Sequence, residues 1–354
     1  MCSSRVLHKV TIQDSQFHMD FYKILGEEAA ICQIQDLTVS LNVENAGSFR
    51  SSVERHLAKW VCTMPKLSTF NLTCFHLRAG FLTTAAELAS SCQIQNLTLS
   101  LNTEKIGSYQ SSAGERLAKW LCTMPRLSTF SLKCFYVRDA FLTTVAKLAS
   151  SCQIRDLTLS LNVEKIGSHR SSVGEDLATW LSSMPRLSTF NLKCFYLRDG
   201  FLAKAAELAS SCQIRKLSME ISMDRISDLA AANLSEFLRL LPHLERANLK
   251  ILCLPETFDA TIAVWVPHCK LLESITVNGK QLLAQRQENE RGRETGHGSG
   301  QDNLQAPEEP ETSRDGNVLK AVVSREDREG QDDIHQEEEE KDKEENKVMT
   351  FEEN

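Results

Sequence analysis

The sequence lacks any long apolar run. No stretch of 18 residues is apolar enough to cross a bilayer, and the N-terminal region has no apolar core of the kind found in secretory signal peptides. These two absences argue against a membrane-spanning or secreted protein. We therefore expect a cytoplasmic location and no membrane partner.

Motifs for catalysis and cofactor binding are missing as well. There is no G-x-x-x-x-G-K-[ST] loop for a triphosphate, no H-E-x-x-H metalloprotease helix and no G-x-S-x-G nucleophile turn. None of the 12 cysteines forms C-x-x-C, and no Cys/His set has zinc spacing. The sequence predicts that the protein is not an enzyme, with no catalytic residues, no cofactor and no metal site.

The main feature that is present is a 60-residue segment that occurs three times and continues into a diverged fourth copy. The copies begin at Cys32, Cys92, Cys152 and Cys212, and the second and third agree at 43 of 60 positions. A strict period of this length is typical of a repeat array, in which each unit contacts its neighbours and one long surface replaces a central cleft.

Each 60-residue unit consists of two half-units, and each half-unit begins with a predicted strand. The pattern L-x-x-L-x-L starts at Ile34 in the first half and at Leu67 in the second. Alternation places Leu37, Val39 and Leu41 on one face of a short strand and the polar residues between them on the other. Extending the pattern in both directions gives about ten parallel strands, starting near Leu7, Ile34, Leu67, Ile94, Leu127, Ile154, Leu187, Ile214, Leu244 and Leu272.

A helix is predicted after each strand. Val53, Leu57, Trp60 and Val61 have the spacing of one apolar helix face, and Pro65 ends that helix. The second half-unit carries an equivalent stripe, and a helix is also expected around residues 17–24. Six large aromatic residues recur at the unit spacing and are predicted to lie in the core: Trp60, Trp120, Trp180, Phe70, Phe130 and Phe190.

The alternating half-units resemble the ribonuclease-inhibitor class of leucine-rich repeats. Segments such as LAKWLCTMPRLSTFSLKCF (117–135) look more narrowly like the repeat region of NOD-like receptors, which are intracellular innate-immune sensors. The resemblance covers about residues 5–280. It implies an α/β horseshoe with strands on the concave face and helices on the convex face. The ATP-binding module that these receptors carry ahead of their repeats does not occur in this sequence.

The cysteines occupy equivalent places in successive units, for example Cys32, Cys92, Cys152 and Cys212. Buried free cysteine behaves as a small apolar residue, so we interpret them as structural thiols. Disulfides and metal ligation are the less favoured alternatives.

The candidate site is the concave face, where the variable strand residues of such an array point. Lysines recur there on alternate strands and favour an acidic protein or peptide as the partner. The competing interpretation is a solvated sheet face whose repetition records duplication. No base-stacking aromatic residues lie between the lysines, so we expect no nucleic-acid partner. The predicted partner-binding residues are Thr98, Ser100, Ser131, Lys133, Thr158, Ser160, Asn191, Lys193, Asn248 and Lys250.

The composition changes near residue 280. Residues 281–354 hold 22 Asp and Glu against 10 Lys and Arg, a net charge of −12, and since the whole chain carries −7, residues 1–280 carry about +5. A segment this polar cannot bury enough surface to offset the entropy of ordering, so we predict a solenoid over residues 1–280 and a disordered acidic tail over 281–354. The tail could serve as a spacer or bind a basic partner.

These observations predict a non-catalytic scaffold that recognises a protein or other ligand on its concave face, as the repeat region of a NOD-like receptor would. The alternative is a regulator of a small GTPase, since a repeat arc with an acidic tail also looks like Ran GTPase-activating proteins and acidic-tailed nuclear regulators. The sequence leaves the ligand and the oligomeric state open.

Overall fold

Successive L-x-x-L-x-L segments pair side by side into one curved sheet. The computed structural model describes residues 8–14, 29–41, 51–74, 77, 79–101, 111–134, 139–161, 172–194, 199–222 and 226–282. In these residues the eleven strands pair in chain order, from β1 to β11. The strands are β1 (Lys9–Asp14), β2 (Asp36–Leu41), β3 (Thr69–Cys74), β4 (Asn96–Leu101), β5 (Thr129–Cys134), β6 (Asp156–Leu161), β7 (Thr189–Cys194), β8 (Lys216–Ile221), β9 (Arg246–Ile251), β10 (Ser274–Val277) and β11 (Lys280–Gln281).

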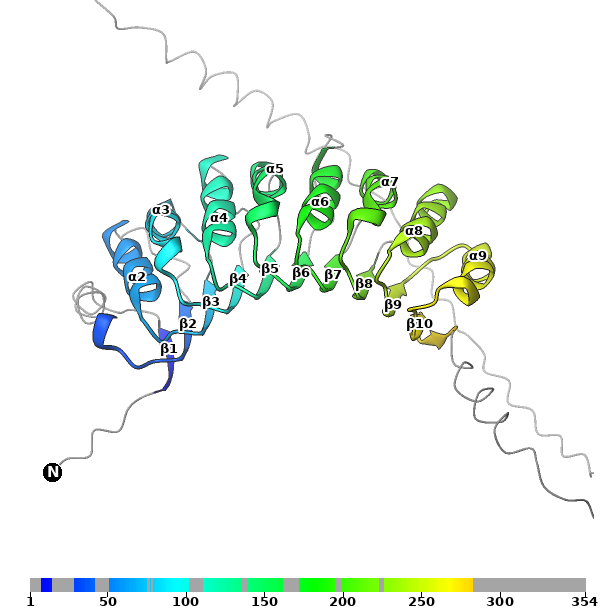
Figure 1. The fold of residues 1–354 in the computed structure, drawn as a ribbon. Helices are drawn as coiled ribbons and strands as arrows, with labels where there is room; N and C mark the ends of the chain where they lie inside the picture. The colour runs from blue at the N-terminus through cyan, green and yellow to red at the C-terminus, as the bar shows by residue number, and fades with distance from the viewer. Residues whose placement is uncertain are drawn as a thin grey trace, which may run out of the picture. The chain divides into compact units, whose positions relative to one another are not determined.

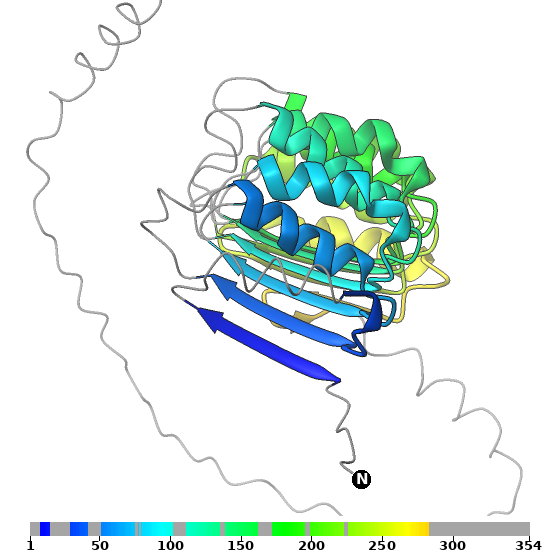
Figure 2. The ribbon, with the colours of Figure 1, turned by 90° about the vertical axis from the view of Figure 1, so that its left-hand side faces the viewer.

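The helices cover one face of this sheet, on the convex side of the curve (Figure 1). Figure 2 shows the same helix layer from the end of the sheet, with no described element over the opposite face. The α-helices are α2 (Ser51–Thr63), α3 (Ala79–Glu87), α4 (Ser111–Thr123), α5 (Asp139–Leu148), α6 (Ser172–Ser183), α7 (Asp199–Leu208), α8 (Asp228–Leu240) and α9 (Thr257–Trp265). Short 3-10 helices follow some of them: η1 (Ala29–Ile31), η2 (Ala89–Ser91), η3 (Ala149–Ser151), η4 (Ala209–Ser211) and η5 (Val266–His268).

The strands pair in register, so equivalent positions of the repeat become neighbours. Leu37 pairs with Phe70, which pairs with Leu97, and the same alternation continues through the middle units. Because side chains alternate along a strand, in-register pairing places these apolar residues on the helix-facing side in continuous rows. The predicted set of ten parallel strands, with helices on the convex face, is confirmed.

Two details differ from the sequence prediction. Each parallel strand begins about two residues after the first motif position, since residues such as Ile34 and Leu67 lie buried in the turn before it. The turn is fixed by a shared acceptor: the backbone N–H groups of Ser68 and Thr69 both donate to the carbonyl of Gln35, at 2.9 and 3.0 Å. The extra strand β11 was not predicted.

Strand β11 is antiparallel to β10 and follows a two-residue turn. Asn278 and Gly279 both have positive φ, 48° and 82°, which matches the left-handed conformation that an Asn-Gly hairpin turn requires. The side chain of Asn278 also accepts from the N–H of Ile251 and donates to its carbonyl, both at 2.8 Å. The side chain of Asn278 therefore bonds the backbone of β9 just beyond the last residue pair between β9 and β10.

Large aromatic residues fill the layer between helices and sheet, as predicted. Trp60, Trp120 and Trp180 are at most 1% exposed. The ring of Phe81 meets Trp120 edge-on with centroids 5.5 Å apart, and the equivalent pair in the next unit has a centroid distance of 5.9 Å. Trp120 and Trp180 therefore each join their own helix to the preceding half-unit.

Two predictions lie outside the described residues. These are the helix expected around residues 17–24 and the tail beyond residue 282. No helix among the described residues is long and apolar enough to cross a membrane.

Candidate functional site on the concave face

The structure brings all ten predicted site residues onto one face of the sheet, in two parallel rows. They lie on strands β4, β5, β6, β7 and β9, at the positions that alternate with the buried leucines. Register pairing aligns Thr98, Ser131, Thr158 and Asn191, which we term the hydroxyl–amide row and which continues to Ser218 and Asn248. The second row, termed the lysine row, consists of Ser100, Lys133, Ser160, Lys193, Glu220 and Lys250.

The hydroxyl–amide row is partly bonded within itself. The amide of Asn191 donates to the hydroxyl of Thr158 at 3.1 Å, and Asn71 donates to Thr38 in the same way at 3.3 Å. These bonds repeat two units apart because register pairing places the two side chains on neighbouring strands. They orient the amides and leave further donor and acceptor capacity on a half-buried surface.

The lysine row is interrupted by a carboxylate. Glu220 accepts from Lys193 at 3.0 Å and from Lys250 at 3.1 Å. Hydrogen bonds from Lys193 and then from Lys250 lower the pKa of Glu220 below its usual value. Among the described residues no carboxylate pairs with Lys133, so the three lysines that the sequence treats as equivalent differ in their surroundings.

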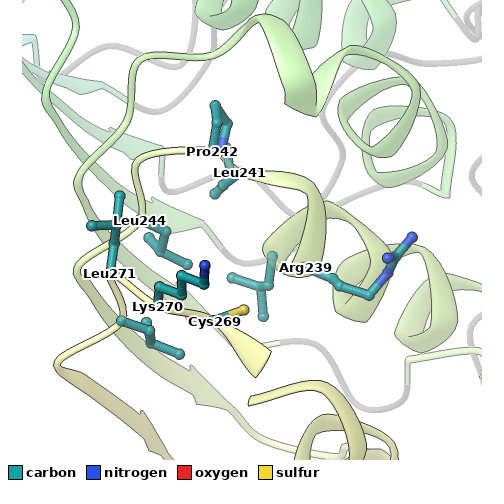
Figure 3. Close-up of a pocket in the computed structure, with 9 residues that line it drawn as sticks. Arg239, Leu241, Pro242, Leu244, Cys269, Lys270 and Leu271 are labelled. Carbon is teal, nitrogen blue, oxygen red and sulfur yellow. The ribbon is translucent and has the colours of Figure 1, made fainter. Parts of the chain in front are cut away.

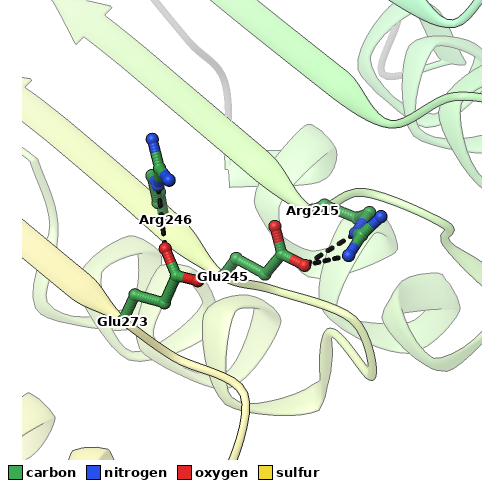
Figure 4. Close-up of polar contacts among 4 residues, drawn as sticks. All are labelled: Arg215, Glu245, Arg246 and Glu273. Atoms are coloured by element: carbon green, nitrogen blue, oxygen red, sulfur yellow. Dashed lines mark hydrogen bonds and ion pairs between the residues drawn. The ribbon is translucent and has the colours of Figure 1, made fainter.

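A third row of charged residues, which the sequence analysis missed, lies at the start of the strands. Arg215 donates to Glu245 through Nε at 2.8 Å, and Arg246 donates to Glu273 at 3.0 Å, so that two ion pairs stand side by side (Figure 4). We term the positions immediately before the strands the edge row, and Arg246 follows it as the first residue of β9. Backbone hydrogen bonds join the edge row in a continuous ladder through Gln95, Ser128, Arg155, Ser188, Arg215, Glu245 and Glu273. Residues 35, 95, 155 and 215 are equivalent positions of the repeat, and they change from Gln in the first two units to Arg in the next two. This change is the sequence signal for the edge row.

The outward positions of β5–β10 and their edge row carry seven basic and four acidic side chains. The equivalent positions of β1–β4 carry only Lys9 and Asp36. The concave face is therefore neutral and hydroxyl-rich toward its N-terminal end and mildly basic toward its C-terminal end. The basic residues are Lys133, Arg155, Lys193, Arg215, Lys216, Arg246 and Lys250, and the acidic residues are Asp156, Glu220, Glu245 and Glu273.

A pocket of about 350 Å³ lies elsewhere, between the turn that precedes β9 and the turn that precedes β10. Leucines and Pro242 form most of its wall, and Arg239, Cys269 and Lys270 lie among them (Figure 3). Arg239 is engaged by Glu236 on the same helix, with Nε 2.7 Å from the carboxylate. None of the predicted site residues contributes to this pocket. Among the described residues, no group of three or more His, Cys, Asp or Glu side chains could hold a metal ion.

No family model and no curated protein matches this sequence significantly. Among solved structures, the chain is similar to the leucine-rich repeat-containing protein LegL7 from Legionella pneumophila, with a TM-score of 0.41 and 13% identity over 79% of this chain and 87% of that one. A protein from Bacteroides fragilis gives a TM-score of 0.38 and 10% identity over 75% of this chain and 74% of that one.

The chain is also similar to TLR13 in the structure of a TLR13–ssRNA13 complex, with a TM-score of 0.37 and 15% identity over 70% of this chain. It spans 33% of that TLR13 chain. The in-register parallel strands, the buried leucine rows and the one-sided helix layer define the fold as a leucine-rich repeat solenoid.

Proposed function

We propose that this protein is a non-catalytic binding scaffold whose concave face recognises an acidic protein or peptide. The observation that carries the proposal is the open sheet face with an excess of three basic side chains over β5–β10. Rigid strands hold the polar groups of this face in fixed rows, which lowers the entropy lost when a partner binds.

The ion pairs on this face are weak enough for a binding partner to replace one of their members. The side chains of Lys193 and Lys250 are 61% and 72% exposed, and Glu220 is 31% exposed. Exposed pairs of this kind contribute at most about 1 kcal/mol each. An incoming carboxylate can therefore replace Glu220 as the partner of either lysine at small cost. Complementary charge of this kind mainly increases the association rate and makes binding sensitive to salt.

The test is binding of a fluorescein-labelled poly-glutamate peptide to the full chain. The triple variant Lys133→Glu, Lys193→Glu and Lys250→Glu reverses the lysine row and should weaken binding by about tenfold or more. The matched control is Lys66→Glu, Lys119→Glu and Lys147→Glu, which makes the same change of charge at exposed turn and helix positions. Equal binding by both variants would contradict the site.

The absence of a nucleic-acid partner remains a prediction, and the same assay tests it. A single-stranded RNA of random sequence is added as a competitor. Our proposal expects RNA to displace the peptide only weakly, with no dependence on base composition, because the face has no interleaved aromatic residues for stacking. Tight, base-dependent competition would replace the acidic-peptide proposal with RNA binding.

The narrower assignment to a NOD-like receptor repeat region, in the cytoplasm, is supported by the style of the repeats in segments such as 117–135. Fractionation of cells that express the full chain tests its location. The GTPase-regulator hypothesis is tested by adding the chain to purified Ran and other small GTPases. Accelerated GTP hydrolysis would favour that alternative over a scaffold that only binds.

A further inference from the structure

Two pairs of buried cysteines occur at equivalent places where one repeat unit meets the next, between the first and second units and between the second and third. Cys62 lies in the last turn of α2 and Cys92 follows η2, and both are fully buried. Helix α2 contacts η2, and the neighbouring Cys92 thiol raises the pKa of Cys62 while Cys62 lowers the pKa of Cys92, so the two side chains are neighbours. Cys122 and Cys152 repeat this arrangement one unit later. Each pair connects a helix of one half-unit to the turn that follows the next helix.

A hydrogen bond between the backbone and a neighbouring side chain also joins the two segments of the second pair. The hydroxyl of Ser151, next to Cys152, donates to the carbonyl of Cys122 at 3.3 Å. The indole of Trp120 also lies next to the thiols of Cys62 and Cys92. In both pairs the segments that carry the two cysteines therefore lie against each other.

The junction between the third and fourth units lacks the pair and provides an internal control. Ser182 stands where the first two units have Cys62 and Cys122. Its hydroxyl donates to the carbonyl of Thr179 at 3.0 Å, while the thiol of Cys212 points to the carbonyl of Leu208 at 3.7 Å. Each group is bonded within its own helical segment, and no hydrogen bond joins Ser182 to Cys212 among the described residues.

We propose that Cys62–Cys92 and Cys122–Cys152 are oxidisable dithiol pairs, which a peroxide converts into two intramolecular disulfides. One thiolate attacks a peroxide oxygen and becomes a sulfenic acid, with release of water or an alcohol. The partner thiol then attacks the sulfenic sulfur, forms the S–S bond and releases water. Two thiols lose two electrons and two protons, and the O–O bond of the peroxide is reduced.

Burial controls how fast this happens. The Cys152 thiol, followed by burial, raises the pKa of Cys122, whereas the Cys62 thiol lowers the pKa of Cys92, so Cys92 is the thiol of its pair that ionises more readily. All four thiols are nevertheless buried in the helix layer. Oxidation must then follow local opening of the helix layer, and it should be slower than oxidation of the exposed Cys253. Once formed, each disulfide closes a loop of about 30 residues and should raise the melting temperature by about 5 °C or more.

The experiment uses the full chain with Cys253→Ser, which removes an exposed thiol that could cross-link two molecules. The reduced protein is incubated with hydrogen peroxide, free thiols are blocked with N-ethylmaleimide, and non-reduced peptides are identified by mass spectrometry. We expect linked peptides that contain Cys62 with Cys92 and Cys122 with Cys152, while Cys212 carries the maleimide. Maleimide on all four paired cysteines at peroxide exposures that oxidise other thiols, or linkage between members of different pairs, would overturn the proposal.

Two variants test the proposal separately, one by removing a native link and one by creating a new link. Cys92→Ser should abolish the first link and leave the second intact. Ser182→Cys restores the missing thiol of the third unit and should create a third link, to Cys212, under the same treatment. Failure of Ser182→Cys to link, while the native pairs also remain unlinked, would show that contact between these positions does not lead to disulfide formation.

Discussion

The near-identical units over residues 32–211 and the diverged part over residues 212–282 share a core but differ in their exposed face. In both, the leucine positions of the strands are buried; Ala247 and Ile275 occupy the row that holds Leu and Phe in the earlier units. On the concave face, the hydroxyl-rich surface of the earlier units gives way to the ion pairs of Glu220, Glu245 and Glu273. A core position accepts only apolar groups of suitable size, whereas an exposed position requires only compatibility with water. The diverged part therefore shows where this fold can change its binding properties.

The buried tryptophans show a second difference. The indole N–H groups of Trp60, Trp120 and Trp180 have no oxygen acceptor among the described residues. In the diverged part, Trp265 donates to the buried hydroxyl of Ser235 at 3.0 Å. The repeated units thus rely on shape and apolar packing, and the last part adds a buried polar pair. Four substitutions test this comparison.

The largest effect is expected for Trp120→Ala, which empties a fully buried site in a repeated unit. Loss of the ring and its contact with Phe81 should lower the free energy of unfolding by about 3–5 kcal/mol. Urea unfolding followed by far-UV circular dichroism measures it, with the neighbouring exposed residue in Lys119→Ala as the control. If Trp120→Ala lowers the free energy of unfolding by less than Trp265→Ala does, packing of the tryptophan in the repeated units contributes less than the packing and hydrogen bond in the diverged part.

The next effect concerns the contact between paired helices in the repeated units. A Cβ atom added at Gly174 would lie 2.8 Å from the backbone nitrogen of Phe201. We expect Gly174→Ala to lower stability by about 1–3 kcal/mol, although alanine favours helix by about 1 kcal/mol over glycine. Glu54 occupies the equivalent position in α2. A gain of stability in thermal unfolding would mean that α6 and α7 can accommodate the added Cβ atom, as α2 and α3 accommodate Glu54.

Ser235→Ala tests the polar pair of the diverged part. It leaves the indole N–H of Trp265 buried without its acceptor, which should cost about 1–3 kcal/mol. A double-mutant cycle with Trp265→Phe isolates the hydrogen bond from the loss of packing, since phenylalanine has no N–H donor. If Ser235→Ala costs the same in the Trp265→Phe background, the hydroxyl contributes nothing through this bond.

The smallest effect on stability is expected for Glu220→Gln on the concave face. Because the pKa of Glu220 is lowered in the folded protein, its contribution is present above the pKa of the unfolded chain and is lost as pH falls through the folded value. The pairs are exposed, so the change should stay within about 1 kcal/mol. Binding of the poly-glutamate peptide should nevertheless become tighter, since Lys193 and Lys250 lose their shared carboxylate. Weaker binding would show that Glu220 itself contacts the peptide.

Much of the fold could be predicted because the repeat displays its own periodicity many times. The alternation around Leu37 and Val39 and the stripe around Trp60 each depend on local spacing, and repetition removes the ambiguity of a single short segment. The hairpin at Asn278 and Gly279 was also encoded locally, by the Asn-Gly signal. The site was harder to predict, because the chemistry of Lys193 depends on which residue the next strand places beside it.

The sequence by itself determined the solenoid, the number of parallel strands and the buried rows, because regular burial of leucines every half-unit leaves few other ways to remove so much apolar surface from water. The tertiary structure alone decided that Glu220 divides the lysine row, that Arg215 and Arg246 stand beside acidic partners, and that Cys62 neighbours Cys92. These are contacts between residues about 27 to 30 positions apart. Their energies depend on side-chain distance and orientation, which the spacing of residues along the chain does not specify.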